Sequence, residues 1–388
     1  MKLYREINKL DLEKEKYISD YIKKITKFEY VYLWGISESC DEAIKFFNKN
    51  KIKIKAIIDQ NPDKYDYKYK NIEVINQPFK SIDKNGAYII TISYYETIKN
   101  KLLTKYNDIE KRLFTYDGYF LENKTIKYYI NNQEIIEKCY ENLADAKSKK
   151  IYNNLLKYRY IRDPKFIKNL YESRNECYLD KTFINNYKDG LYIDAGSYNA
   201  DFITTLQSKV NINDSKFYIF EPNKVFYNNI INNLDKKINY KIFDIALCDK
   251  EDKMEFMQIP SSTSHIINKK YNAYKNTIDK NKISYVKTNK LDNIITKDKV
   301  SGIKIDVEGS EASLLKGATN IIKRDRPILL LAIYHKWDDL FKLQNYIINL
   351  NQEYKFYIRH YSLSVAKTIL YCIPNKKQVN WLTKKRVI

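Results

Sequence analysis

Asp306 and Glu308, with one residue between them, lie at the end of a short apolar segment. That segment, residues 302–307, predicts a buried strand. Apolar residues at helical spacing follow Gly309. Side chains alternate along a strand, so the two carboxylates face the same side. The carboxyl ends of parallel strands are where open α/β sheets bind ligands. Two carboxylates there are costly unless a cation or a proton donor meets them, so the pair predicts acid–base or metal chemistry.

His335 follows the next apolar segment, residues 328–333. If that strand lies beside the Asp306 strand, the imidazole and the two carboxylates meet at one sheet edge. Two uses of this set are open. His335 can act as a general base that a carboxylate holds in place. Alternatively, Asp306, Glu308 and His335 can bind a divalent cation such as Mg, Mn or Fe, which accept oxygen and imidazole ligands.

Two further segments have the residue types of a ligand-binding sheet edge. One is the run Asp194-Ala195-Gly196-Ser197, which follows an apolar segment and precedes a helical pattern. Its small side chains let a ligand approach the backbone closely. Glu221 ends another apolar segment, where a carboxylate can accept both hydroxyls of a ribose, and Pro222 behind it ends the strand. An ordinary turn and a solvated acid are the alternatives.

In their order along the chain, these segments resemble the FkbM-type S-adenosylmethionine-dependent methyltransferases. The resemblance covers roughly residues 180–375, about half of the chain. The stretches that carry it are residues 192–199, 217–223, 244–249, 290–292, 302–318 and 326–335.

The resemblance implies a role for each of these stretches in binding S-adenosylmethionine. The loop 194–197 contacts the methionine portion, and Glu221 with Pro222 holds the ribose. Asp244 accepts the adenine amino group and Ala246 flanks the ring, although a cap or turn role competes for Asp244. Asp306 lies beside the cofactor and, with His335 and Glu308, forms the predicted catalytic set.

Two other histidines are candidates for the acceptor side of the site. His265 lies in the polar segment 261–265, and such a loop commonly covers the acceptor in this fold, so we add His265 to the catalytic candidates. A surface histidine is its alternative. His360, together with Arg359, can line the acceptor pocket or serve a structural role.

Composition restricts the class of protein. The chain has 388 residues and a formal charge of +21, but its lysines are scattered through every segment. We therefore expect no dedicated nucleic-acid groove, and an anionic substrate fits the charge. The five cysteines are dispersed, which favours a reducing compartment. No apolar run reaches a membrane span, and the N-terminus lacks the apolar core of a signal peptide, so we expect a cytoplasmic protein.

The order of elements predicts an α/β protein in three parts. Residues 1–122 read as a smaller Rossmann-like module, in which Gly35 alone represents the dinucleotide motif, so a partner-docking or substrate-docking role is favoured. Residues 123–180 read as a helical connector. Residues 181–388 form the methyltransferase domain, for which the resemblance implies a class I doubly wound sheet with an antiparallel terminal hairpin.

We therefore predict an S-adenosylmethionine-dependent O-methyltransferase. The resemblance points to a sugar hydroxyl, and the charge favours a nucleotide-activated sugar or a phosphorylated glycan precursor. A homo-oligomer is compatible with the N-terminal module. Two alternatives come from other classes of protein: an RNA-directed methyltransferase or RNA-binding protein, and a non-catalytic scaffold that binds the cofactor without turnover.

Overall fold

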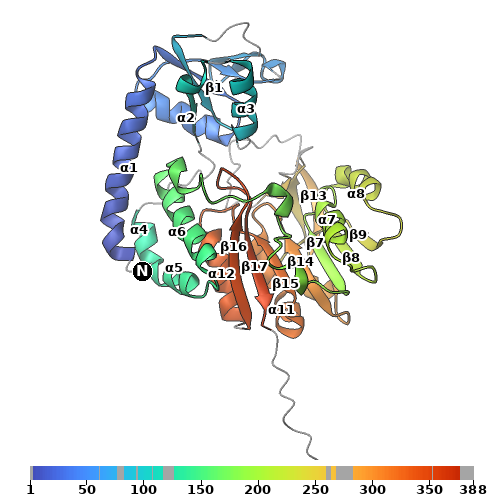
Figure 1. Cartoon of the computed structure of the whole chain (residues 1–388). Coiled ribbons are helices and arrows are strands. Elements are labelled where there is room, and N and C mark those ends of the chain that lie inside the picture. The colour runs from blue at the N-terminus through green and yellow to red at the C-terminus, as the bar shows by residue number, and fades with distance from the viewer. Residues whose placement is uncertain are drawn as a thin grey trace, which may run out of the picture.

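Two parallel-dominated sheets, each flanked by helices, form a mixed α/β protein (Figure 1). The structure is a computed structural model that describes residues 3–60, 62–76, 83–92, 95–106, 108–116, 126–258, 264–267, 283–351 and 353–375. The N-terminal sheet lies in one body with its helices, and the larger sheet lies in a second body that contains the C-terminal half of the chain.

The N-terminal sheet has six strands in the order β3-β4-β2-β1-β5-β6. All neighbours are parallel except β3 and β4, as expected where helical crossovers connect the strands. Ser37 caps α2 by accepting from the Cys40 N–H. The elements are β1 (Tyr30–Trp34), α2 (Glu38–Lys49), β2 (Ile54–Ile58), β3 (Lys68–Tyr69), β4 (Ile72–Ile75), β5 (Gly86–Ile90), α3 (Tyr95–Lys105) and β6 (Leu113–Thr115).

One long helix, α1 (Leu3–Ile25), packs against both bodies. Its Leu10 belongs to the apolar core of the larger body, whereas its Ile25 is buried in the N-terminal core. The predicted connector is helical and consists of α4 (Ile126–Asn131), α5 (Gln133–Glu141) and α6 (Ala146–Ile161). Because α1 contributes to both cores, the boundaries at residues 122 and 180 stay a prediction.

The larger sheet has seven strands in the order β16-β17-β15-β14-β7-β8-β9. Neighbours from β15 to β9 are parallel, and β17 pairs antiparallel with both β15 and β16. The central strands read as continuous apolar runs because helices cover both faces. The strands are β7 (Leu191–Ala195), β8 (Lys216–Phe220), β9 (Asn239–Phe243), β14 (Val300–Ile305), β15 (Ile328–Ala332), β16 (Tyr354–His360) and β17 (Thr368–Pro374).

Short helices connect these strands and cover the sheet. Four of the six named below follow the carboxyl end of a strand of the large sheet, which places those strand-to-helix loops along one edge. The helices are α7 (Asp201–Lys209), α8 (Tyr227–Asn233), α9 (Leu291–Ile294), α10 (Glu311–Gly317), α11 (Thr319–Asp325) and α12 (Asp339–Leu350).

A small sheet between β9 and β14 differs from the sequence prediction. The stretch 244–249, which carries part of the resemblance, lies outside the large sheet: the strand beside β8 is β9, and β10 (Ile245–Leu247) leaves that sheet. It pairs with β13 (Ile283–Asn289) in a four-stranded sheet that also contains β11 (Asp252–Met257) and β12 (His265–Ile266). The apolar run continues across Asp244, so the sequence pattern does not separate the two strands.

None of the helices in the described ranges combines the length and the apolar character that a bilayer crossing requires.

Candidate active site

The loop after β7 approaches β14 so closely that only glycine fits. Gly196 has φ +79°, and a Cβ on it would lie 2.0 Å from the Asp306 carbonyl oxygen. Tyr198 and Ala200 also have positive φ, at 56° and 64°. Left-handed backbone is uncommon outside glycine and is retained where the surrounding structure holds it, often at functional sites. The loop is therefore a shaped surface against the Asp306 backbone.

A buried ion pair lies beneath this loop. Lys304 Nζ is 3.1 Å from Asp194 Oδ1 and donates to the Gly196 carbonyl at 2.5 Å. Ser197 Oγ donates to Asp194 Oδ2 at 2.7 Å. Asp194 and Lys304 are 1% and 5% exposed. Asp194 and Ser197 thus hold the loop from below, and neither lines the cleft above it.

Glu221 is buried at the wall of that cleft. Its Oε2 accepts from the Tyr198 N–H at 3.1 Å and its Oε1 from the Asn223 N–H at 2.9 Å. Burial raises the pKa of Glu221, while these two backbone N–H groups oppose the shift. A carboxylate has about four lone-pair sites, so two bonds leave acceptor capacity toward the cleft.

The remaining wall of the cleft is largely apolar. Aromatic and aliphatic side chains of this kind suit a flat, largely apolar ligand such as an adenine ring. The other lining residues include Ala195, Pro222, Phe220, Phe226, Ala246, Leu247, Phe256 and Ile266.

Asp244 does not belong to this lining. Its side chain is 49% exposed and lies 3.4 Å from Lys224 Nζ, on the outer side of the strand end. An adenine contact through Asp244 would require that pair to rearrange, whereas Ala246 already faces the cleft.

Asp306 lies at the far end of the cleft, where several groups stabilise its charge. Tyr334 donates to Asp306 Oδ1 at 2.9 Å, and Lys367 Nζ is 3.5 Å from Oδ2. Burial opposes ionisation, but Lys367 and then His335 hold the pKa of Asp306 well below its usual range. The ionised form of Asp306 is therefore favoured at this end of the cleft.

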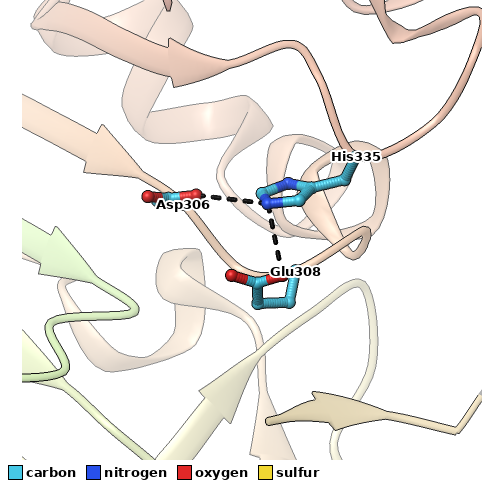
Figure 2. Close-up of side chains that lie close together, drawn as sticks. All are labelled: Asp306, Glu308 and His335. Atoms are coloured by element: carbon cyan, nitrogen blue, oxygen red, sulfur yellow. Dashed lines mark ion pairs between the residues drawn. The ribbon is translucent and has the colours of Figure 1, made fainter. Parts of the chain in front are cut away.

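His335 is surrounded by three carboxylates. Its Nε2 is 3.4 Å from Asp306 Oδ1 and 3.3 Å from Glu308 Oε2, and Figure 2 shows both side chains pointing at that nitrogen. Its Nδ1 is 2.8 Å from Glu311 Oε1. Burial opposes protonation, yet Glu308 and Glu311 raise the pKa of His335 well above its usual range. A positive charge on or beside the ring is strongly favoured here.

A second cleft meets the first at Glu308. It lies between the four-stranded sheet and α10, and its walls include Glu308, His335 and the buried His265. Glu308 and His265 line both clefts. Three lysines, Lys250, Lys316 and Lys336, also line the second cleft. Residues 259–263 lie outside the described residues, so only Ser264 and His265 of the predicted polar loop can be placed.

His360 takes a structural position. It is fully buried, its Nδ1 lies 2.9 Å from Thr368 Oγ1, and burial lowers its pKa to about 3. Neighbouring Arg359 is enclosed by Asp145 and Asp180, at 2.7 and 3.2 Å. Neither residue lines either of the two clefts described above.

Three residues of the site were missed by reading the sequence. Lys304 has a weak signal, since it interrupts an otherwise apolar strand. Glu311 looked like an acid in the first turn of a helix, and only the fold brings it to His335. Arg159, on α6, donates to the carbonyls of Trp337 and Ile333 at 2.7 and 2.8 Å and so holds the turn that carries His335.

Comparison with known proteins agrees with this geometry. Residues 194–358 match the family model described as the methyltransferase FkbM domain. The chain carries a methyltransferase FkbM domain. The matched segment includes both clefts, from the Asp194 loop to the strand β16. A methyltransferase of this family implies S-adenosylmethionine as the methyl donor. Among curated proteins, none matches the chain significantly.

The fold likeness extends beyond the FkbM domain. A crystal structure of methyltransferase FkbM from Methylobacillus flagellatus KT aligns with 90% of this chain and 92% of its own, with a TM-score of 0.60 and 15% identity. At that identity the likeness shows a shared fold that includes the N-terminal module. A precorrin-6y C5,15-methyltransferase from Geobacter metallireducens GS-15 covers 52% of this chain and 91% of its own, but its TM-score of 0.29 and 9% identity carry no argument.

Proposed function

We propose that this chain is an O-methyltransferase that transfers the methyl group of S-adenosylmethionine to a hydroxyl of an anionic, sugar-type acceptor. The observation that carries the proposal is the meeting of two clefts at Asp306, Glu308 and His335. One cleft has the features of a cofactor site, and the other contains lysines suited to an anionic acceptor. The strand order of the large sheet supports the class I methyltransferase fold that the resemblance implied.

The cofactor cleft fits the donor at three points. Gly196 lines the cleft without a side chain, so its backbone is available to the methionine portion. Glu221 retains acceptor capacity for the ribose hydroxyls, and the apolar wall suits adenine. When bound, S-adenosylmethionine supplies an electrophilic methyl group on a sulfonium.

The chain's own residues must orient the acceptor and remove a proton. An acceptor in the second cleft reaches the first cleft past Glu308 and His335. As the new O–methyl bond forms, the electron pair of the broken S–methyl bond stays on sulfur, and the hydroxyl proton must leave. Asp306, Glu308 and His335 act on that hydroxyl, either with His335 as the base or through a cation that lowers the hydroxyl pKa.

The lysines favour an acceptor with phosphate groups, such as a nucleotide-activated sugar or a phosphorylated glycan precursor. Lys316 and Lys250 lie on opposite walls of the second cleft, on α10 and next to β11. Cations that line one cleft raise the local concentration of an anionic substrate. Lys316→Gln should therefore raise KM for a phosphorylated acceptor, whereas Lys323→Gln on α11, which does not line the cleft, should leave it unchanged.

Calorimetry and a methyl-transfer assay test the proposal together. We expect S-adenosylmethionine or its demethylated product to bind at micromolar level, about −8 kcal/mol. Labelled methyl groups should then move to a nucleotide sugar and not to the neutral sugar. Absence of binding heat at high ligand concentration contradicts the whole proposal. Binding without transfer to any acceptor supports the scaffold alternative, and transfer to RNA supports the RNA-directed alternative.

A further inference from the structure

We propose that Asp306, Glu308 and His335 together bind one divalent cation at the junction of the two clefts, with Glu311 orienting His335. Binding of the cation stands on the geometry of these four residues alone. Its use in catalysis, to orient the acceptor hydroxyl and make it easier to deprotonate, rests on the proposed function.

The spacing of the donor atoms fits a small cation. One donor atom from each of the three residues lies within 4.8 Å of the others, and His335 Nε2 is 3.3–3.4 Å from the two carboxylate oxygens. Adjacent ligands of an octahedral cation with bonds of about 2.1 Å are about 3 Å apart. The three residues therefore need only small adjustments to coordinate one ion.

The hydrogen bonds of Glu311 determine which ring nitrogen faces the site. Glu311 Oε1 accepts from the Val307 and Gly309 N–H groups at 3.1 and 3.2 Å, and it lies 2.8 Å from His335 Nδ1. An oxygen that accepts two backbone N–H bonds is an acceptor for the ring as well, so Nδ1 carries a proton. A carboxylate behind a histidine in this way is the usual outer support of a metal-binding imidazole.

His335 Nε2 is then directed at two carboxylates with no hydrogen-bond partner of its own. The side chain is 3% exposed, and Nε2 is buried without a bond of acceptable geometry. An unprotonated Nε2 would direct its lone pair at two anions, so either a proton on the ring or a cation between the groups is needed at this point. A cation at this point would satisfy the nitrogen and both carboxylates together.

The charges around the site leave room for a divalent ion. Three carboxylates surround His335, and Lys367 contacts Asp306 at the oxygen that does not face the ring. Lys304 is already paired with Asp194. A divalent cation added to Lys367 would balance the three acids, which are costly to bury uncompensated.

The turn at Glu308 and Gly309 also positions a candidate ligand. Glu308 has φ +49° and Gly309 has φ +95°, so a residue with a long side chain occupies the left-handed region directly before a glycine. Such a conformation aims the Glu308 carboxylate back at His335, as Figure 2 shows.

A second acidic cluster, Glu172, Glu176 and Asp180, provides a matched contrast. Its carboxylates also lie close enough to share an ion. However, Arg359 Nε lies 3.2 Å from Asp180 and 3.9 Å from Glu172, so a guanidinium already supplies the positive charge. We expect no cation there.

The donor set indicates which ions to use. Two carboxylates and one imidazole suit Mg, Mn or Fe(II), and they lack the thiolates that select softer metals. Mn²⁺ is the best probe because it is paramagnetic and tolerates the same ligands. The test uses the full chain, freed of metal by a chelator and then titrated with Mn²⁺ alone.

We expect saturable binding of one Mn²⁺ per chain, with a pulsed-EPR nitrogen coupling from a single imidazole. His335→Gln should abolish the nitrogen coupling and weaken binding by at least about 100-fold, and Glu311→Gln should weaken it about 10–100-fold. Glu176→Gln, in the contrasting cluster, should bind as the wild type does. Circular dichroism checks that each variant is folded.

Two outcomes would overturn the inference. One is wild-type protein that binds no Mn²⁺ saturably, and the other is bound Mn²⁺ without nitrogen coupling. Calorimetry with S-adenosylhomocysteine on the metal-free chain separates this result from the proposed function. If the chain binds the cofactor but not Mn²⁺, the cation site is contradicted and the methyltransferase proposal stands. If it binds Mn²⁺ but not the cofactor, the cation site stands and the methyltransferase proposal is contradicted.

Discussion

The two parallel sheets of this chain have equivalent strand pairings at their carboxyl edges, but different residue types follow the paired positions. Trp34 pairs with Ile90 in the N-terminal sheet as Ala195 pairs with Ile305 in the large sheet. The next residues along the chain are Gly35 and Thr91 in the first sheet. In the second they are Gly196 and Asp306.

The acids after the second strands correspond as well. Asp59 follows β2 and accepts from the Ile36 N–H at 3.1 Å, and Glu221 follows β8 and accepts from the Tyr198 N–H at 3.1 Å. The decisive difference is at the third strand. Thr91 donates its hydroxyl to the carbonyls of Trp34 and Gly35, at 2.9 and 2.6 Å, and is fully buried.

Among the described residues, the two Rossmann-like edges differ in how their polar groups are satisfied. A threonine closes the N-terminal edge with bonds inside the chain. The corresponding Asp306 cannot be satisfied in that way, since it accepts and does not donate, so its edge depends on added positive charge or a ligand. Four predictions test this difference, from the largest expected effect to the smallest.

Replacing His335 should have the largest effect. His335→Ala is expected to lower turnover by about 10²–10⁴ while leaving cofactor affinity nearly intact, because the ring lines the second cleft and not the proposed cofactor cleft. Steady-state kinetics beside calorimetry provide the two readouts. Asp59→Asn at the N-terminal edge is the matched control, and we expect no change in turnover. Near-normal turnover of the His335 variant would contradict the assigned catalytic set and leave His265 as the next candidate.

The Lys304–Asp194 ion pair of the large sheet should stabilise its loop more than the Thr91 hydrogen bonds stabilise the loop of the N-terminal sheet. Lys304→Met leaves Asp194 buried without its cation, and we expect the free energy of unfolding to fall by about 3–5 kcal/mol. Thr91→Val removes one hydroxyl donor and should cost about 1–3 kcal/mol. Urea unfolding monitored by fluorescence measures both. The double change Lys304→Met with Asp194→Asn should recover part of the loss, and no recovery would show that the pair is not the support.

Glu221 should give cofactor binding a pH dependence. The ionised carboxylate accepts the ribose hydroxyls, and burial raises its pKa in the free protein. Affinity should therefore be constant at high pH and fall as the pH drops through that raised pKa, above the ordinary value of about 4.3. Glu221→Gln should lose about 1.5–3 kcal/mol per charged hydrogen bond and flatten the profile. An unchanged slope in that variant would mean that another group titrates.

Removing the N-terminal module should change cofactor affinity least. A chain that lacks residues 1–122 keeps every residue that lines the two clefts, so we expect the same dissociation constant within about threefold. Its melting temperature should fall, because Leu10 leaves the core of the larger body. Loss of cofactor binding in a folded truncated chain would place part of the site in the module.

The sequence predicted the site residues wherever a polar residue directly follows an apolar run that forms a strand. Asp306, Glu308 and His335 follow apolar runs, and the fold places them side by side. The second cleft could not be predicted, because it depends on β10 leaving the large sheet at Asp244. Glu311 was out of reach for a similar reason: its partner His335 is 24 residues away, and only the packing of α10 on the β15 turn brings them together.

The helix α1 links the N-terminal module to the larger body of the molecule. Its Asp11 accepts from Tyr160 on α6, and the adjacent residue, Arg159, holds the two carbonyls that flank His335. At its other end, Tyr21 reaches the Thr115 carbonyl of the N-terminal sheet. This helix of 23 residues thus joins the N-terminal module to α6, and through Arg159 to the turn that carries His335. A partner or substrate that reorients the N-terminal module would move α1, and through Arg159 it would displace the turn that carries His335. We expect such a movement to change turnover.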